Sequence, residues 1–268
     1  MAGSENTEAI VERIELLKVP LDIVPNEAFD AHFSAIFSQI QKEALDNSKD
    51  NAGREGKNIV LLSIWDLLRA RRRNEYRDFI KKAAVIAPIS KSLIGGVHFL
   101  RQKTAVRYNP FHFIINLLTV LENHEGSVYF LGGSEKVLKK MENNIRQTFP
   151  GLRILGRCDA SFRKQDASVI VQAIRKAAPD LLLVGKGVKG EELWIARNHK
   201  ALNRGLRFWC SDIFEVFAKT KSRPSDAIFD IGFENVILCF RNPLRLFRIF
   251  PYLRYKFLLL FYRLFKKN

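Results

Sequence analysis

The sequence predicts an α/β protein built on a parallel sheet with helices on both faces. Short apolar runs recur along its 268 residues, and helix-like stretches separate most of them. Strands that alternate with helices of this length form right-handed βαβ units, whose helices cover the sheet. With 47% apolar residues, the chain can also bury a large core. We therefore expect one α/β domain over residues 1–239 and a different, helical segment over residues 240–268.

Seven runs are predicted as strands, because they are apolar and rich in β-forming residues and turn residues bound them. They are Val19–Val24, Ile59–Ile64, Ala84–Pro88, Ser127–Leu131, Leu152–Gly156, Leu181–Gly185 and Leu206–Cys210. The polar stretch 46–57 is the best candidate for a loop or linker. The strands should lie in one parallel sheet, whose carboxyl edge is where ligands of such folds bind.

Two helices between these strands have clear start and stop signals. Ser134 can cap the first helix, and Pro150 with Gly151 ends it. One face of that helix carries Leu138, Met141, Ile145 and Phe149. The second helix runs over Asp166–Ala178 and ends at Pro179. Both lengths are those expected of the connections in a parallel sheet.

The net charge of +16 indicates an anionic partner, which can be a nucleic acid, an acidic membrane or a phosphorylated substrate. The basic run around Arg71 would suit nucleic acid, but Leu67, Leu68 and Tyr76 interleave with it at helical spacing. We therefore interpret it as a solvated helix face. No recognised nucleic-acid-binding motif is present, so nucleic acid is not the expected partner.

Targeting and metal signals are weak in this sequence. Three scattered cysteines suit neither a disulfide framework nor a metal site. The acidic N-terminus lacks the apolar core of a secretory signal. The longest membrane candidate, Phe257–Tyr262, is far shorter than the roughly 20 residues that a span needs. These observations predict a cytoplasmic protein without a membrane span and without a bound metal.

The stretch LLLVGKGVKGEELW places Gly185, Gly187 and Gly190 in a G-x-G-x-x-G order after a predicted strand. Glycine lets backbone N–H groups approach phosphate oxygens, so a phosphate-bearing ligand is expected here. A dinucleotide site would need this motif in the first βα turn, and the adjacent acidic pair would repel a diphosphate. A second pair, Gly132 and Gly133, follows an earlier strand, so both loops can line one cleft. The alternative is that these glycines only permit tight turns.

Several stretches occur in the order and spacing of a known family. They are FLGG, TFPGLRILG, PDLLLVGKGVKGEELWIARN, RP, GFEN and RNPLRLFR, with VPLDIV and RYNPFHFIINLL fitting more loosely. From about Arg13 to Arg248 the chain resembles the WecB/TagA/CpsF glycosyltransferases, glycosyltransferase family 26. The resemblance covers most of the chain.

The resemblance implies a Rossmann-like fold with a membrane-binding C-terminal appendage. It also implies an inverting, metal-independent and cofactor-free transfer of an N-acetylhexosamine, such as N-acetylmannosamine, from a UDP donor. The acceptor would be a GlcNAc carried by undecaprenyl diphosphate. On this template the nucleotide-sugar-binding residues are Gly132, Gly133, Gly185, Gly187, Glu191, Glu192 and Arg107. Glu192 matches the family pattern, Glu191 replaces a glutamine, and Gly190 takes the place of a lysine.

Other positions depart from the family pattern. The family places a catalytic aspartate in a Pro-Asp-Gly motif, where this chain has Ile89, and isoleucine cannot accept a proton. A family threonine and asparagine are Leu61 and Ser63, and a later aspartate is Glu215. The family's Gly-Ser-Asp is replaced by residues 110–112.

Two side chains are candidates for a substitute base. His112 can supply a neutral imidazole near pH 7, or it can simply pack or cap the helix that begins near Pro110. Asp66 follows the second predicted strand, and its alternative role is the N-cap of the helix that runs into Arg71.

Residues 240–268 form a basic and aromatic tail without any acidic residue. Arg241, Arg245 and Arg248 share one helical face, and a second amphipathic segment is expected beyond a break at Pro251. Such segments lie in the plane of an anionic bilayer. The residues expected to contact the membrane or a diphosphate are Arg241, Arg245, Arg248, Arg254, Lys256 and Arg263. A packed helix with solvated cations is the alternative.

Taken together, these features predict a glycosyltransferase peripheral to the inner face of the cytoplasmic membrane. Its partners would be a UDP-N-acetylhexosamine donor, a polyprenyl-diphosphate-linked acceptor and the anionic membrane surface. A catalytically impaired nucleotide-sugar binder or scaffold is the second hypothesis, because Ile89 replaces the expected acid. An NAD(P)-dependent oxidoreductase is the third, and a homo-oligomer is left open.

Overall fold

The computed structural model describes residues 11–45, 56–72, 74–202, 204–223, 225–226, 229 and 249–265. Its centre is a six-stranded sheet in the order β4-β3-β8-β7-β5-β6, and every pairing between neighbours is parallel. The strands are β3 Lys57–Leu62, β4 Val85–Pro88, β5 Ser127–Leu131, β6 Arg153–Cys158, β7 Leu181–Gly185 and β8 Leu206–Ser211. The predicted α/β class and parallel sheet are therefore confirmed, with small shifts at the strand ends.

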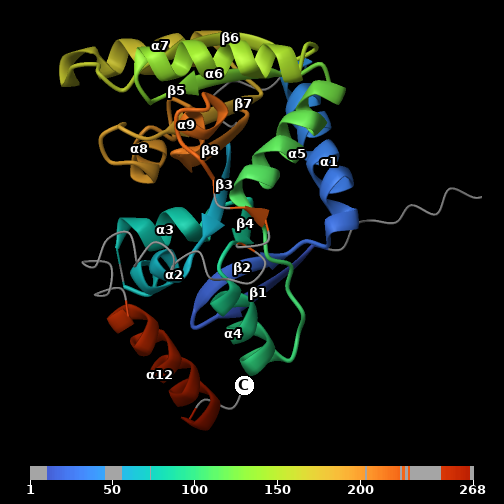
Figure 1. Ribbon diagram of the computed structural model, residues 1–268, viewed down its shortest axis with the longest axis vertical. Coiled ribbons are helices and arrows are strands. Elements are labelled where there is room, and N and C mark those ends of the chain that lie inside the picture. Colours follow the sequence, from blue (N-terminus) through green and yellow to red (C-terminus); the bar gives the residue numbers. More distant parts are fainter. Residues whose placement is uncertain are drawn as a thin grey trace, which may run out of the picture.

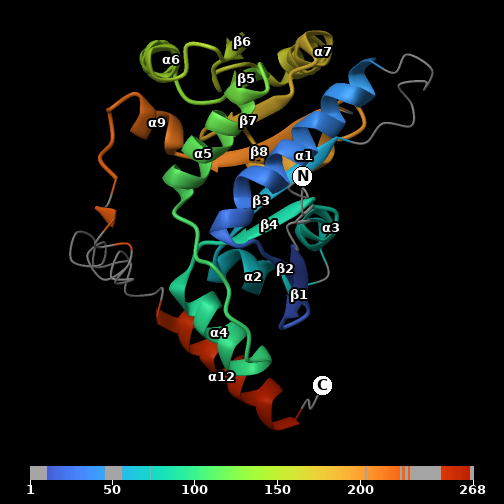
Figure 2. The same ribbon diagram turned by 90° about the vertical axis from the view of Figure 1, so that its right-hand side faces the viewer.

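Helices cover both faces of this sheet, as Figure 2 shows for α6 and α7 on opposite sides of β5 and β6. One apolar core joins the sheet to α1 Asn26–Leu45, α5 Pro110–Asn123, α6 Glu135–Thr148 and α9 Ile213–Phe217. The other core contains α2 Ile64–Ala70, α3 Glu75–Lys81, α4 Lys91–Arg101, α7 Ala167–Ala177 and α8 Glu192–Arg197. Alternate residues of β3 serve the two cores, Ile59 the first and Val60 the second, because successive side chains of a strand point to opposite faces.

The two helices with clear sequence signals form as predicted. Ser134 is the N-cap of α6 and accepts a hydrogen bond from the Val137 N–H, while Leu138, Met141 and Ile145 are buried. A short 3-10 turn, η2 Lys164–Asp166, precedes α7. The chain leaves α7 through a left-handed residue, Ala178, just before Pro179.

The first predicted strand does not join the parallel sheet. β2 Val19–Ile23 pairs antiparallel with β1 Glu12–Leu16, a strand that the sequence pattern missed. Leu17 and Lys18 between them both have positive φ angles, of 52° and 68°, the backbone of a tight hairpin turn. The hairpin still contacts the sheet, since the buried Asp22 carboxylate accepts from the Ile86 N–H at 2.8 Å. The prediction was wrong because this strand pairs with the segment just before it, across a two-residue turn, instead of with a strand of the parallel sheet.

α12 Ile249–Phe265 packs against α2 and α4, at the end of the molecule opposite α6 and α7 (Figure 1, Figure 2). Tyr255 is fully buried there, and its hydroxyl donates to the Ser92 carbonyl at 2.9 Å. A Cβ atom at Gly96 would overlap that hydroxyl, so the α4 glycine makes room for the tyrosine. Pro251 lies in the first turn of α12 instead of breaking a helix, because an N–H needs no helical partner there.

Within the part of the chain that is described, no helix is long and apolar enough to cross a membrane. Three of the tail residues assigned to the membrane or a diphosphate lie outside the described residues, namely Arg241, Arg245 and Arg248. The other three, Arg254, Lys256 and Arg263, lie on α12.

Candidate functional site

A cleft of about 410 Å³ lies at the carboxyl ends of β4, β3 and β8. In an open α/β sheet this edge is where ligands bind, because loops diverge there. Ile59, Ile89 and Trp209 contribute apolar walls. The polar side chains that line it are Ser63, Asp66, Arg69, Tyr76, Glu191, Glu192, Ser211 and Asp212.

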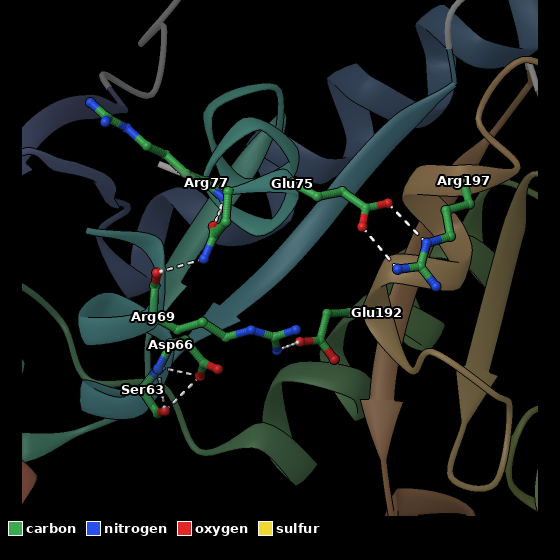
Figure 3. Close-up of polar contacts among 8 residues, drawn as sticks. Ser63, Asp66, Arg69, Glu75, Arg77, Glu192 and Arg197 are labelled. Carbon is green, nitrogen blue, oxygen red and sulfur yellow. Dashed lines mark hydrogen bonds and ion pairs between the residues drawn. The ribbon is translucent and has the colours of Figure 1, made fainter. Parts of the chain in front are cut away.

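The first turn of α2 holds Asp66 at this cleft. Ser63 is the N-cap of α2, and its hydroxyl accepts from the Asp66 N–H. In return Asp66 Oδ2 accepts from the Ser63 N–H at 2.9 Å and from the Ser63 hydroxyl at 2.5 Å (Figure 3). This reciprocal capping box satisfies backbone donors that a helix start otherwise leaves unpaired. The alternative role predicted for Asp66, the N-cap itself, is wrong, since Ser63 occupies that position one turn earlier.

Arg69 and Glu192 form an ion pair across the cleft, from α2 to α8. Arg69 Nη1 lies 2.5 Å from Glu192 Oε1 (Figure 3), and the Arg69 guanidinium lies 4.1 Å from the centre of the Tyr76 ring. The Glu192 side chain is only 10% exposed. Burial therefore raises the pKa of Glu192, while the charge of Arg69 opposes that rise. Burial also raises the pKa of the Tyr76 hydroxyl, helped by the neighbouring carboxylate of Asp66.

A second ion pair connects α3 to α8 beside the cleft. Both Glu75 carboxylate oxygens accept from the Arg197 guanidinium, each at 2.9 Å (Figure 3). Hydrogen bonds from Arg197 lower the pKa of Glu75. Both side chains are about half exposed and neither lines the cleft. This pair therefore resembles Arg69–Glu192 in chemistry but lies in solvent.

Ile89 lines the cleft, and the polar side chains that share it include Ser63, Asp66 and Asp212. Arg107 does not line the cleft. Its Nε donates to the Ile89 carbonyl at 2.9 Å and its guanidinium lies over the Phe229 ring, so Arg107 supports the loop that carries Ile89.

His112 and Glu215 lie outside the cleft lining. His112 is in the first turn of α5, after the N-cap Asn109, and its side chain is 50% exposed. Its Nε2 lies 2.9 Å from Arg223 Nη1 and 3.4 Å from Asp226 Oδ1. The structure therefore brings Asp66, but not His112, into the cleft beside Ile89.

The two glycine loops contact each other, but, contrary to the expectation from the sequence, they do not both line the cleft. A Cβ atom at Gly132 would lie 2.6 Å from the Gly185 carbonyl oxygen, so only glycine fits where these strands end. The Gly133 N–H donates to the Lys186 carbonyl at 2.7 Å. Gly187 has a φ of 95° and lies against Ala160. Of these loops, Glu191 and Glu192 line the cleft and the four glycines do not.

The sequence prediction missed Arg69, Tyr76 and Asp212 as cleft residues. Arg69 belongs to the basic run that was interpreted as a solvated face. A usable signal was its spacing of three residues from Asp66, which places both on one face of α2. Among the described residues, no group of three or more His, Cys, Asp and Glu side chains is arranged to hold a metal ion.

The fold and the cleft at the carboxyl edge define an α/β protein with a Rossmann-like sheet and a polar cleft at the edge where such folds bind ligands. Its sequence matches the model of the glycosyl transferase WecG/TagA/CpsF family over residues 32–268. Because that match covers most of the chain, the protein belongs to this glycosyltransferase family, and the predicted resemblance is confirmed.

Curated relatives of this chain carry the name N-acetylglucosaminyldiphosphoundecaprenol N-acetyl-beta-D-mannosaminyltransferase. One from Staphylococcus aureus strain NCTC 8325 is 22% identical over 148 residues, which is 55% of this chain and 58% of that relative. One from Bacillus spizizenii is 20% identical over 216 residues, or 81% of each chain. The chain thus aligns with little more than half the length of the staphylococcal relatives.

Proposed function

We propose that the protein transfers an N-acetylhexosamine, similar to N-acetylmannosamine, from a UDP-sugar to a sugar carried on polyprenyl diphosphate. Family membership and the names of the relatives support this class of acceptor. The observation that carries the proposal is the cleft at the carboxyl edge, where Asp66 lies in the same lining as Ile89. A carboxylate is thereby supplied from α2 where the family's motif has lost its own.

Asp66 would act as the general base of an inverting transfer. The carboxylate removes the proton from the acceptor hydroxyl while that oxygen attacks the anomeric carbon of the donor. The bond from that carbon to the diphosphate breaks, and UDP leaves with the bonding electrons. Such a base contributes typically 10²–10⁴-fold to a rate. Ser63 holds the Asp66 side chain in place through two hydrogen bonds, so the base is positioned before the acceptor arrives.

The outer face of α12 would place the protein on the cytoplasmic surface of an anionic membrane. Its exposed apolar side chains include Phe250, Leu253, Phe257, Leu260, Leu264 and Phe265, between 51% and 71% exposed. Arg254, Lys256 and Arg263 lie on the same helix. Apolar groups entering the acyl boundary and cations at the headgroups together hold a peripheral protein. The acceptor's lipid would lie in the same membrane.

Transfer of a radiolabelled N-acetylhexosamine from UDP to a short-chain polyprenyl-diphosphate GlcNAc, in anionic vesicles, tests the proposal. We expect the full chain to catalyse transfer and Asp66→Asn to lose about 100-fold or more of the rate. His112→Ala, outside the cleft, is the control and should retain the rate. Loss of transfer in His112→Ala with full activity in Asp66→Asn would assign the base to His112 instead.

The second candidate is a catalytically impaired binder of nucleotide sugars, which Ile89 in the cleft favours. Binding of UDP without any transfer to the lipid-linked acceptor, in the same vesicles, would support it. Binding of NAD(P) without binding of UDP would overturn both candidates and favour an oxidoreductase.

A further inference from the structure

The cleft contains many more acidic than basic side chains. Asp66, Glu191, Glu192 and Asp212 line it, whereas Arg69 is the only basic residue among the described residues of the lining. Lys221 pairs with Asp212 from outside the cleft. A nucleotide diphosphate that enters such a cleft is repelled unless a cation meets it. Among the described residues of the lining, Arg69 is therefore the cation that can meet the diphosphate.

We infer that Arg69 binds the diphosphate of the donor and that, on binding, it exchanges the carboxylate of Glu192 for phosphate oxygens. This inference rests on the proposed function and names the recognition residue of the same site. The family resemblance does not assign Arg69 to a ligand. The basic run to which Arg69 belongs was interpreted from the sequence as a solvated helix face.

Arg69 is placed and shaped for this exchange. Its side chain is 43% exposed, so a ligand in the cleft can reach it. The guanidinium carbon lies 4.1 Å from the centre of the Tyr76 ring, and α2 is anchored by its capping box. A guanidinium has five N–H donors in a planar fork that matches phosphate oxygens, and the bond to Glu192 uses only Nη1. Rotation of the outer side-chain bonds is therefore enough to redirect the fork.

Glu192 can lose this partner without remaining a buried, unpaired charge. Its side chain is 10% exposed, and burial already raises its pKa. The charged or titratable groups around it are Arg69, Asp66, Glu191 and the Tyr76 hydroxyl. When Arg69 moves away, the remaining acidic neighbours favour uptake of a proton by Glu192. Glu192 is thus neutralised by Arg69 before the ligand binds and by a proton afterwards.

The Glu75–Arg197 pair provides a matched control. It joins α3 to the same helix, α8, through two bonds of 2.9 Å (Figure 3). Neither member lines the cleft. Removing it tests whether the loss of any ion pair to α8 alters ligand binding.

The experiment measures dissociation constants for UDP and for uridine by ligand-observed NMR and calorimetry on the full chain. We expect Arg69→Gln to weaken UDP binding by about tenfold or more, because hydrogen bonds to charged groups are strong. Uridine, which has no phosphate, should bind within about twofold of wild type. Glu192→Gln should bind UDP as tightly as wild type or more tightly, since Arg69 is then released. The Glu75→Gln/Arg197→Gln control should change neither ligand.

Arg69→Gln leaves Glu192 without its partner and can lower stability, so Arg69→Gln/Glu192→Gln is the second variant. It removes both charges together and should show the same loss of UDP affinity. If wild type binds UDP and both Arg69 variants bind it within twofold, the role of Arg69 is wrong while the proposed function survives. If Glu192→Gln weakens UDP binding as much as Arg69→Gln does, the exchange is wrong. If wild type binds no UDP, the proposed function fails and this inference fails with it.

Discussion

Asp66 is oriented by the helix that it helps to begin. Its carboxylate caps the backbone of Ser63, and the Ser63 hydroxyl holds the carboxylate in return. A stabilising motif found at many helix starts therefore also positions the proposed base. Stability and activity should for this reason depend on the same serine.

Ser63→Ala should lower the free energy of unfolding by roughly 1 kcal/mol, the usual cost of a lost N-cap. It should also slow transfer, because the Asp66 carboxylate loses the hydrogen bond from the Ser63 hydroxyl and keeps only the one from the backbone N–H of that residue. Ser134→Ala removes the N-cap of α6, outside the cleft, and serves as the control. Urea unfolding should show similar losses for both variants, and the transfer assay should separate them. Equal activity in the two would contradict the positioning role.

Glu192 should make stability fall as pH rises. Burial raises its pKa in the folded protein above the ordinary value of 4.5. The folded state therefore binds this proton more tightly than the unfolded chain does, and stability is lost as pH rises through the raised pKa. Thermal unfolding from pH 4 upward should show a downward slope in wild type that Glu192→Gln lacks.

Glu75 should have the opposite effect on the pH dependence of stability, because its pKa is lowered and not raised. Arg197 lowers its pKa, so any contribution of this carboxylate is present above the ordinary range and is lost as pH falls. The pair is exposed, and its effect should be small and weakened by salt. For Glu192, the contradicting outcome is that wild type and Glu192→Gln show parallel profiles of stability against pH. Burial of Glu192 would then have no effect on the free energy of unfolding.

At the level of elements, α12 docks on α4 through one tyrosine and one glycine. Tyr255 is buried against Gly96 and donates to the Ser92 carbonyl. α4 begins at Lys91, two residues after Ile89 of the cleft. The proposed membrane helix is therefore attached to the element that follows directly from the cleft wall.

Gly96→Ala should displace Tyr255 and destabilise the protein by about 1–3 kcal/mol, the usual cost of overpacking. Gly95→Ala is the matched control, because a Cβ atom there meets open space. That variant should be stabilised by roughly 0.5–1 kcal/mol, since alanine replaces glycine in an exposed helix. Urea unfolding measures both, and hydrogen exchange at Tyr255 and Leu259 reports whether α12 has undocked. Protection of both residues in Gly96→Ala would contradict this packing.

At the level of the whole molecule, α12, which carries exposed apolar side chains, lies at one end, and α7 lies at the other (Figure 1). A membrane that contacts α12 would therefore leave the α7 end in solution. The cleft lies at the carboxyl edge of β4, β3 and β8, on the sheet half to which α2 and α4 belong. This arrangement suits the proposed acceptor, whose lipid would lie in the membrane while its sugar extends from the membrane surface to the cleft.

Phe257→Asp/Leu260→Asp should reduce sedimentation with vesicles rich in anionic lipid by about tenfold, because two exposed apolar side chains are lost and two negative charges that anionic lipid repels are added. Val169→Asp alters an exposed apolar residue of α7 and should leave vesicle binding unchanged. UDP binding should be the same in all three proteins, since none of these positions lines the cleft. Unchanged sedimentation of the α12 variant would contradict the membrane contact.

Local patterns predicted much of this molecule from the sequence. Apolar runs located all six strands of the sheet, and Ser134 and Pro150 located the ends of α6. The same reasoning placed Val19–Val24 in the wrong sheet and missed β1. It also left His112 and Asp66 as equal candidates, because no local pattern says which of two loops meets Ile89.

The sequence by itself determined the six strands of the parallel sheet, the βαβ connections and the family, since periodicity, helix caps and motif order are properties of neighbouring residues. Only the tertiary structure decided that β1 and β2 form a hairpin, that Asp66 shares a cleft with Ile89, and that Arg69 pairs with Glu192. The last two residues are 123 positions apart. Their charges meet because the parallel sheet brings the carboxyl ends of distant strands to one edge, and no local pattern encodes that meeting.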